Sequence, residues 1–88
     1  AISIGNRSSA TDAGSVAIGS TSQAAKGGVA LGIESKATAS SSMALGQNSS
    51  ATEYLSMALG NFSSASANNA MAMGYLAKAK SGSSYGYR

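Results

Sequence analysis

The sequence repeats itself with a period of 14 residues, and this period restricts the chain to a few kinds of fold. Six tetrapeptides are variants of one unit, in which a large residue, a small one and a second large one precede Gly, as in residues 16–19 and 43–46. Three residues after each of these glycines the chain has Ser, except at Ala77, and five residues after it has Ala. Two such columns, kept in phase over six copies, identify an internal repeat. The repeated glycines are Gly5, Gly19, Gly32, Gly46, Gly60 and Gly74.

The length of the repeat predicts its architecture. Alternating large and small residues before each Gly are typical of a β-strand, and a second alternating stretch, Ser-x-Ala, follows the Gly. Two short strands and two turns use about 14 residues, which is one coil of a parallel β-solenoid whose coils stack about 4.8 Å apart. We therefore predict an all-β solenoid and a single domain over residues 1–88, with residues 85–88 as a degenerate seventh copy. The one missing residue between Gly19 and Gly32 falls within 25–28, where we expect a looser turn.

The small residues indicate how the coil is filled. Ala, Ser and Gly make up 48 of the 88 residues, whereas Leu, Ile, Val and Phe together make up 12. We expect the large residues of the first strand, such as Val16 and Ile18, to face into the coil, and the residue between them to face outward. Because a solvated column would contain Lys, Glu, Gln or Thr, an outward column of Ala predicts contact with another chain. A homotrimer suits such a slender solenoid. The candidate interface residues are Ala17, Ala30, Ala44, Ala58 and Ala72.

The composition also argues against catalysis. The chain has no Cys and no His, so disulfides, thiolate metal sites and the commonest general base are absent. Its only acids are Asp12, Glu34 and Glu53. Asp12 and Glu53 share a phase but lie three coils apart, roughly 14 Å, whereas a glycosidase pair needs about 5–9.5 Å. The glycines match no phosphate-binding motif. The sequence therefore predicts no enzyme, no cofactor and no metal.

Two sets of residues are candidates for binding a ligand. Lys36 and Lys78 share one phase on the outward side of the second strand, where they serve either solubility or a weakly positive face that attracts acidic matrix or polysaccharide. Tyr54, Phe62 and Tyr75 fall in the predicted turns, where they either cover coil edges and pack between chains or form an anchor patch for a protein partner. No aromatic stacking platform accompanies the charge, so we expect no nucleic acid.

Three segments carry a family resemblance: SVAIGSTS at 15–22, SMALGQNS at 42–49 and SMALGNFS at 56–63. They resemble the head repeat of YadA-like trimeric autotransporter adhesins, and the resemblance covers essentially the whole chain. It implies a left-handed parallel β-roll, three chains around a common axis, and display at the surface of the Gram-negative outer membrane in a role in virulence. The implied function is non-enzymatic cell adhesion, by binding host cells or matrix proteins such as collagen, fibronectin or laminin. The family's neck, stalk and membrane anchor are expected outside these 88 residues, so the resemblance implies no membrane insertion by this segment.

Two other functions stay open. The solenoid could be a spacer that projects another binding domain and has no ligand of its own. An ice-binding solenoid would need an unbroken Thr ladder, but the column six residues after Gly is interrupted. It consists of Thr11, Ala25, Thr38, Thr52, Ser66 and Lys80.

Overall fold

Two parallel β-sheets face each other along the whole length of the structure. The computed structural model describes residues 1–80 and 85–87, and the described part contains thirteen short strands. The first sheet contains β1 (Ile2–Ile4), β3 (Val16–Ile18), β5 (Val29–Leu31), β7 (Met43–Leu45), β9 (Met57–Leu59), β11 (Met71–Met73) and β13 (Tyr85–Tyr87). The second contains β2 (Ser9–Ala10), β4 (Gln23–Ala24), β6 (Lys36–Ala37), β8 (Ser50–Ala51), β10 (Ser64–Ala65) and β12 (Lys78–Ala79).

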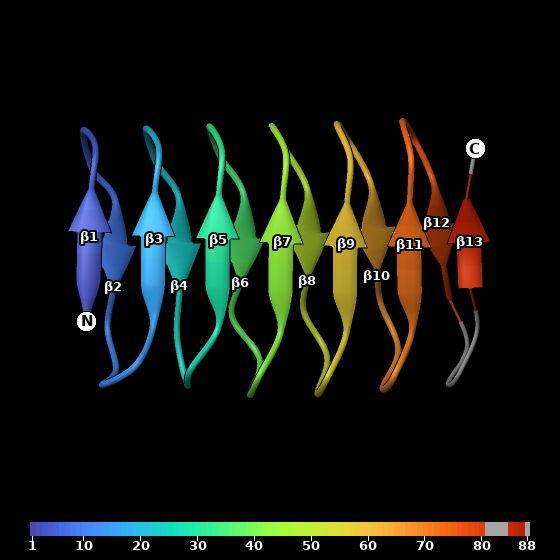
Figure 1. Cartoon of the computed structure of the whole chain (residues 1–88), viewed down its shortest axis with the longest axis horizontal. Helices are drawn as coiled ribbons and strands as arrows, with labels where there is room; N and C mark the ends of the chain where they lie inside the picture. Colours follow the sequence, from blue (N-terminus) through green and yellow to red (C-terminus); the bar gives the residue numbers. More distant parts are fainter. Residues whose placement is uncertain (81–84, 88) are drawn as a thin grey trace.

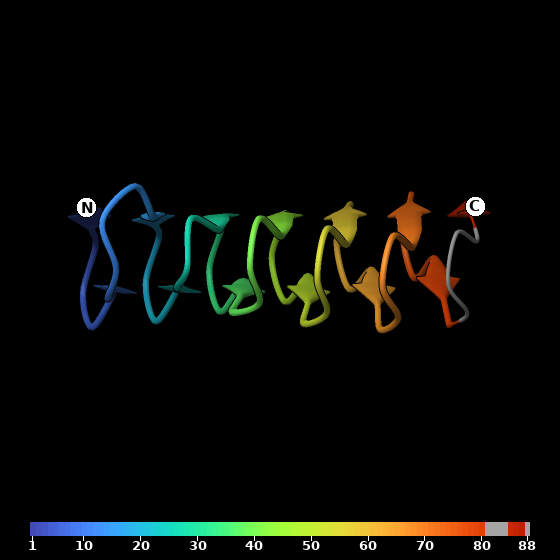
Figure 2. The same cartoon turned by 90° about the horizontal axis from the view of Figure 1, so that it is seen from below.

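Each coil contributes one strand to each sheet, so the fold is the predicted parallel β-solenoid. Equivalent residues of successive coils pair in register, for example Ala30 with Ala44 and Ala44 with Ala58. In Figure 1 the chain runs up the seven-stranded sheet, crosses behind it, runs down the six-stranded sheet and advances by one coil, which makes the solenoid left-handed. Figure 2 shows the two sheets as separate layers. Within the described residues, no helix is long and apolar enough to cross a membrane.

The last copy of the repeat continues the seven-stranded sheet. Strand β13 pairs in parallel with β11, with Tyr85 opposite Met71 and Gly86 opposite Ala72. By this register, residues 85–87 continue the strand order of the preceding copies, while Arg88 lies outside the described residues.

The repeated Gly forms the turn from the first sheet to the second, which we call the Gly turn. Gly32 has a φ of 129°, and a Cβ built on it would lie 2.7 Å from the carbonyl carbon and oxygen of Gly46 in the next coil. Both the backbone angle and the close approach therefore exclude any side chain. The same contact recurs from Gly5 through Gly60, so the column of glycines sets how closely the coils stack.

The Ser three residues after Gly closes this turn, as the sequence predicts. The Ser49 hydroxyl donates a hydrogen bond to the Gly46 carbonyl at 2.8 Å, and the Ser49 amide donates to the same oxygen at 3.2 Å. A second Ser column, which the sequence analysis did not identify, closes the return turn to the first sheet: the Ser56 hydroxyl donates to the Glu53 carbonyl at 2.6 Å. Among the described residues, every buried side-chain nitrogen and oxygen has a hydrogen-bond partner.

Backbone hydrogen bonds join the turns of successive coils, as they join the strands. In the Gly turn, the residue before Ser has a φ near 60° although it is never Gly, as in Thr21 at 61° and Phe62 at 62°. This angle directs its amide at the preceding coil, so that the Thr21 amide donates to the Asn6 carbonyl at 2.8 Å. The return turn has the equivalent bond, from the Leu55 amide to the Ser40 carbonyl at 3.1 Å. The predicted length change lies in this return turn, between β4 and β5.

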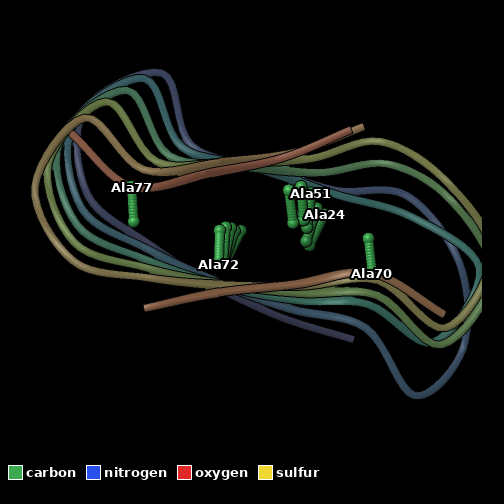
Figure 3. Packing of buried hydrophobic residues seen from close by; sticks show 12 residues of the cluster. Ala24, Ala51, Ala70, Ala72 and Ala77 are labelled. Atoms are coloured by element: carbon green, nitrogen blue, oxygen red, sulfur yellow. The ribbon is translucent and has the colours of Figure 1, made fainter. Parts of the chain in front are cut away.

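The interior of the coil consists of alanine, which reverses the predicted orientation of the first strand. Ala44 and the equivalent alanines of four other coils are 0% exposed in the single chain, and the fully buried side chains of greatest volume are serines. Figure 3 shows Ala72 of one sheet and Ala24 and Ala51 of the other pointing into the same narrow space. The Cα atoms span only 11 Å along the shortest principal axis, and two facing sheets already need about 10 Å. The methyl group of Ala fits this space, whereas Val, Leu and Met are left outside.

Candidate binding surfaces

The predicted interface alanines do not reach the surface of the chain. Each is 0% exposed, so the prediction that they contact a partner chain is wrong. The physical reason is their place in the strand: side chains alternate between the two faces, and the thin coil takes the small residue inside. The five residues are Ala17, Ala30, Ala44, Ala58 and Ala72.

The large residues instead form a continuous outer surface on the seven-stranded sheet, which we call the apolar face. Two side chains from each strand lie in two columns, and register pairing joins Leu31 to Leu45 and Leu45 to Leu59. Most members are half-buried, whereas Ile18 and Met73 are 38% and 39% exposed and the two residues of the first coil, Ile2 and Ile4, are 52% and 56% exposed. A continuous apolar surface of this extent is typical of an interaction site rather than of a solvated face. Over the coils with described side chains, the columns are Ile2, Val16, Val29, Met43, Met57 and Met71, and Ile4, Ile18, Leu31, Leu45, Leu59 and Met73.

The outer side of the six-stranded sheet has the opposite character, and we call it the polar face. Its outward positions, four and six residues after each Gly, carry seven hydroxyls, three Lys, one Gln and one Ala, without a carboxylate. Lys36 and Lys78 both lie here and are exposed, as the sequence predicts. The positions are Ser9, Thr11, Gln23, Ala25, Lys36, Thr38, Ser50, Thr52, Ser64, Ser66, Lys78 and Lys80.

Two shallow hollows open on the polar face. The larger, of about 290 Å³, runs across the second to fourth coils and is lined by Gln23, Lys36 and Ser50 together with Thr21, Glu34, Asn48 and Ser49 of the Gly turns. The smaller, of about 230 Å³, adjoins it at Gln23 and extends to Ser9 and Thr11 of the first coil. Sequence reasoning identified the two lysines but not these hollows, because their walls combine side chains from several successive coils, which only the folded chain brings together.

The candidate aromatic residues lie at opposite edges of the solenoid. Phe62 and Tyr75 belong to Gly turns of adjacent coils, and their rings meet edge to face with centroids 6.4 Å apart. Tyr54 is in a return turn at the other edge, beside Leu55, and both side chains are exposed. The structure therefore brings Phe62 and Tyr75 together and separates them from Tyr54. The exposed fraction of Phe62 is 43% and that of Tyr75 is 59%.

One acidic side chain, Asp12, has a structural role in the turns. Asp12 accepts a hydrogen bond from the Lys26 backbone amide at 2.6 Å, which joins the return turns of the first two coils. Glu53 has the equivalent place in the fourth coil, where its backbone carbonyl accepts the hydrogen bond from the Ser56 hydroxyl. Among the described residues, no group of three or more acidic side chains lies together as a metal site would require.

The repeat and its geometry define a class of protein, the short-coil β-solenoids with one apolar and one polar outer face. The YadA head domain repeat model matches residues 1–22, 24–49 and 51–79, which together are most of the chain. The chain therefore belongs to the YadA head domain repeat family, a family of adhesin-type domains. A comparison with curated proteins finds none that matches.

Proposed function

We propose that this chain is a non-enzymatic adhesin head that assembles with two copies of itself and attaches a bacterial cell to host cells or extracellular matrix. The observation that carries the proposal is the apolar face. Val, Ile, Leu and Met form a surface along at least six stacked strands, while the interior of the chain holds only small side chains. An apolar surface of this kind is typical of a site that packs against another molecule. Family membership supports three copies and display at the outer surface, in a single head domain over residues 1–88.

The energetics favour assembly over an isolated chain. Folding each coil costs backbone entropy, which the burial of apolar surface has to offset. The interior of the coil buries little more than alanine methyl groups, and a buried methylene contributes only about 0.8 kcal/mol. Covering the apolar face adds two large side chains per coil, each contributing about 1.5–3 kcal/mol when fully buried. A closed ring of copies brings these faces together around one axis.

Assembly places the polar face and the turn edges on the outside. These surfaces repeat along the solenoid and again in each copy, so weak contacts with a repetitive matrix ligand add up by avidity. Matrix proteins such as collagen, fibronectin or laminin are the proposed partner class. This arrangement needs no catalytic group in the chain.

Mass measurement followed by a ligand screen on the same sample tests the proposal. Light scattering is expected to give three times the chain mass, and the same material is expected to bind a matrix protein or a host cell in a solid-phase assay. A stable folded monomer would contradict the assembly. A trimer that binds no matrix protein and no cell would favour the alternative, a spacer that projects another binding domain.

A further inference from the structure

The cations of the polar face are placed at the two ends of a strip of hydroxyl groups. In the column four residues after Gly, Lys36 pairs in register with Ser50, Ser50 with Ser64, and Ser64 with Lys78. Ser50 and Ser64 are half-buried, whereas both lysines are exposed. At about 4.8 Å per coil, the two lysines lie roughly 14 Å apart. One ligand that reaches both must therefore run along the solenoid axis and carry separated negative groups.

The neighbouring column adds to the same strip. Thr52, Ser66 and Lys80 stand two residues further along the chain, directly after their strands, and on the same side of the sheet. The amides of Thr52 and Ser66 still bond to the next coil, at 3.4 and 3.0 Å, so these positions keep the register of the sheet. Lys80 doubles the positive charge at the end that carries Lys78. The middle of the strip offers hydroxyl donors and acceptors in a flat, regular array.

The larger hollow continues the strip beyond Lys36. Its walls carry the Gln23 amide, the Asn48 amide and the Glu34 carboxylate. These groups suit a neutral, hydroxyl-bearing part of a ligand, since the carboxylate repels an anion at that point but accepts hydrogen bonds. The anionic groups of the ligand would then bind at the lysines.

The side chains of this face also restrict the class of ligand. Its outward positions hold no apolar side chain larger than Ala25, so a protein partner finds no pocket for an aromatic or aliphatic anchor. They hold no aromatic ring on which a nucleic-acid base could stack. A linear chain of hydroxylated, negatively charged units satisfies both the array and the charge.

We propose that the polar face binds an acidic polysaccharide laid along the solenoid axis, with its anionic groups at Lys36 and at Lys78 and Lys80, and its hydroxyls over Ser50, Thr52, Ser64 and Ser66. This inference rests on the proposed adhesive role and names the face and the ligand class for it. Charge complementarity over a flat surface gives weak single-site binding that falls as salt is raised. In an assembled head each copy presents one such face, so a long polysaccharide gains from avidity.

Heparin affinity tests the inference on the full chain at about 0.15 M salt, the physiological ionic strength. The double variant K36Q/K78Q is expected to weaken heparin binding at least tenfold. The control R7Q/K26Q removes the same number of charges from the two turns and is expected to weaken it less than threefold. Equal losses in the two variants would overturn the proposal, because they would indicate attraction by net charge alone. Failure of the unaltered chain to bind heparin more tightly than uncharged dextran would overturn it as well.

A charge placed inside the strip tests the path of the ligand. Ser50→Asp puts a carboxylate between the two lysines and is expected to abolish heparin binding, whereas Ser41→Asp adds the same charge in an exposed return turn and is expected to reduce it less than threefold. Retained binding in Ser50→Asp would contradict a ligand that runs over the strip. Light scattering on each variant shows whether a loss of heparin binding comes from a loss of assembly. A chain that adheres to cells without binding heparin would refute the ligand class while leaving the adhesive role intact.

Discussion

The two sheets of each coil share one interior but present opposite outer surfaces. In the fourth coil, Leu45 stands outside the first sheet and Ser50 outside the second, while Ala44 and Ala51 fill the space between them. The difference shows that large apolar residues need not mark the core of a solenoid. When the coil is too thin for them, they mark the side of the sheet on which other chains can pack. The polar face is then left for a ligand.

The shared interior is expected to be the most sensitive part of the structure. Ala44→Lys would bury an ammonium group without a partner, at a cost of about 3–5 kcal/mol. The overpacked stem would add about 1–3 kcal/mol, so both sheets should be lost together. Circular dichroism and thermal melting would measure this loss. The control Lys36→Ala, on the polar face, is expected to change the stability by less than about 0.5 kcal/mol. A folded Ala44→Lys would mean that this column faces water.

The Gly turn joins the two sheets and comes next in expected effect. Gly46→Ala would place a Cβ 2.6 Å from the Gly60 carbonyl oxygen and a non-Gly residue at a φ of 126°. Backbone strain of about 1–3 kcal/mol and overpacking of a similar size give a loss of roughly 2–6 kcal/mol. Gly27→Ala is the matched control, because Gly27 has positive φ but nothing within 4 Å of its missing Cβ. It should cost only about 1–2 kcal/mol in chemical denaturation. Equal losses at the two positions would contradict the role given to coil stacking.

Two separate variants, each with one new lysine on one outer face of the same coil, allow a direct comparison of the two faces. Leu45→Lys is expected to weaken assembly by about 1.5–3 kcal/mol per chain, since it removes an aliphatic side chain from the face that we propose joins the copies. Ser50→Lys should leave the mass by light scattering unchanged. If both variants stay fully assembled, or both dissociate, the apolar face is not the surface that joins the copies.

The smallest expected effect is a gain of stability in the turn between the sheets. Thr21 holds a φ of 61°, which is unfavourable for a β-branched residue and easier for Asn. Thr21→Asn should therefore stabilise the fold by about 0.5–1 kcal/mol without altering the outward strand positions of either sheet. Thr52→Asn makes the same exchange on the polar face, outside the positions of positive φ, and should give no gain. A higher melting temperature in both variants would point to a cause other than backbone strain.

Much of the fold could be predicted from the sequence because the repeat constrains the backbone. The Gly and Ser columns correspond to turn geometry that few other residues satisfy, so the coil length, the turns and the phase of residues 85–87 followed from spacing alone. The orientation of the strand did not follow. Alternation shows that Val16 and Ile18 share one side of the strand and Ala17 has the other, but not which side is enclosed.

A signal for the correct orientation was present in the variability of the columns. The column of Ala44 holds only Ala, Ser or Gly, as a space of fixed width requires, whereas the column of Met43 contains Ile, Val, Met and Tyr. On the candidate sites, the phase of Lys36 and Lys78 correctly predicted a common outward face. The pairing of Phe62 with Tyr75, and their separation from Tyr54, depends on which turn each residue occupies at opposite edges of the coil, which only the folded chain shows.

The rate of thiol labelling tests the central claim, which is that other copies cover the apolar face while the polar face stays exposed to solvent. The chain contains no Cys, so single variants report one position each. Leu59→Cys and Ser64→Cys lie in the same coil, on the apolar and the polar face respectively, and both positions are half-buried in the single chain. We predict that a thiol reagent modifies Ser64→Cys rapidly and Leu59→Cys at least tenfold more slowly in the native protein, with equal rates in denaturant. Equal rates in the native protein would show that nothing covers the apolar face.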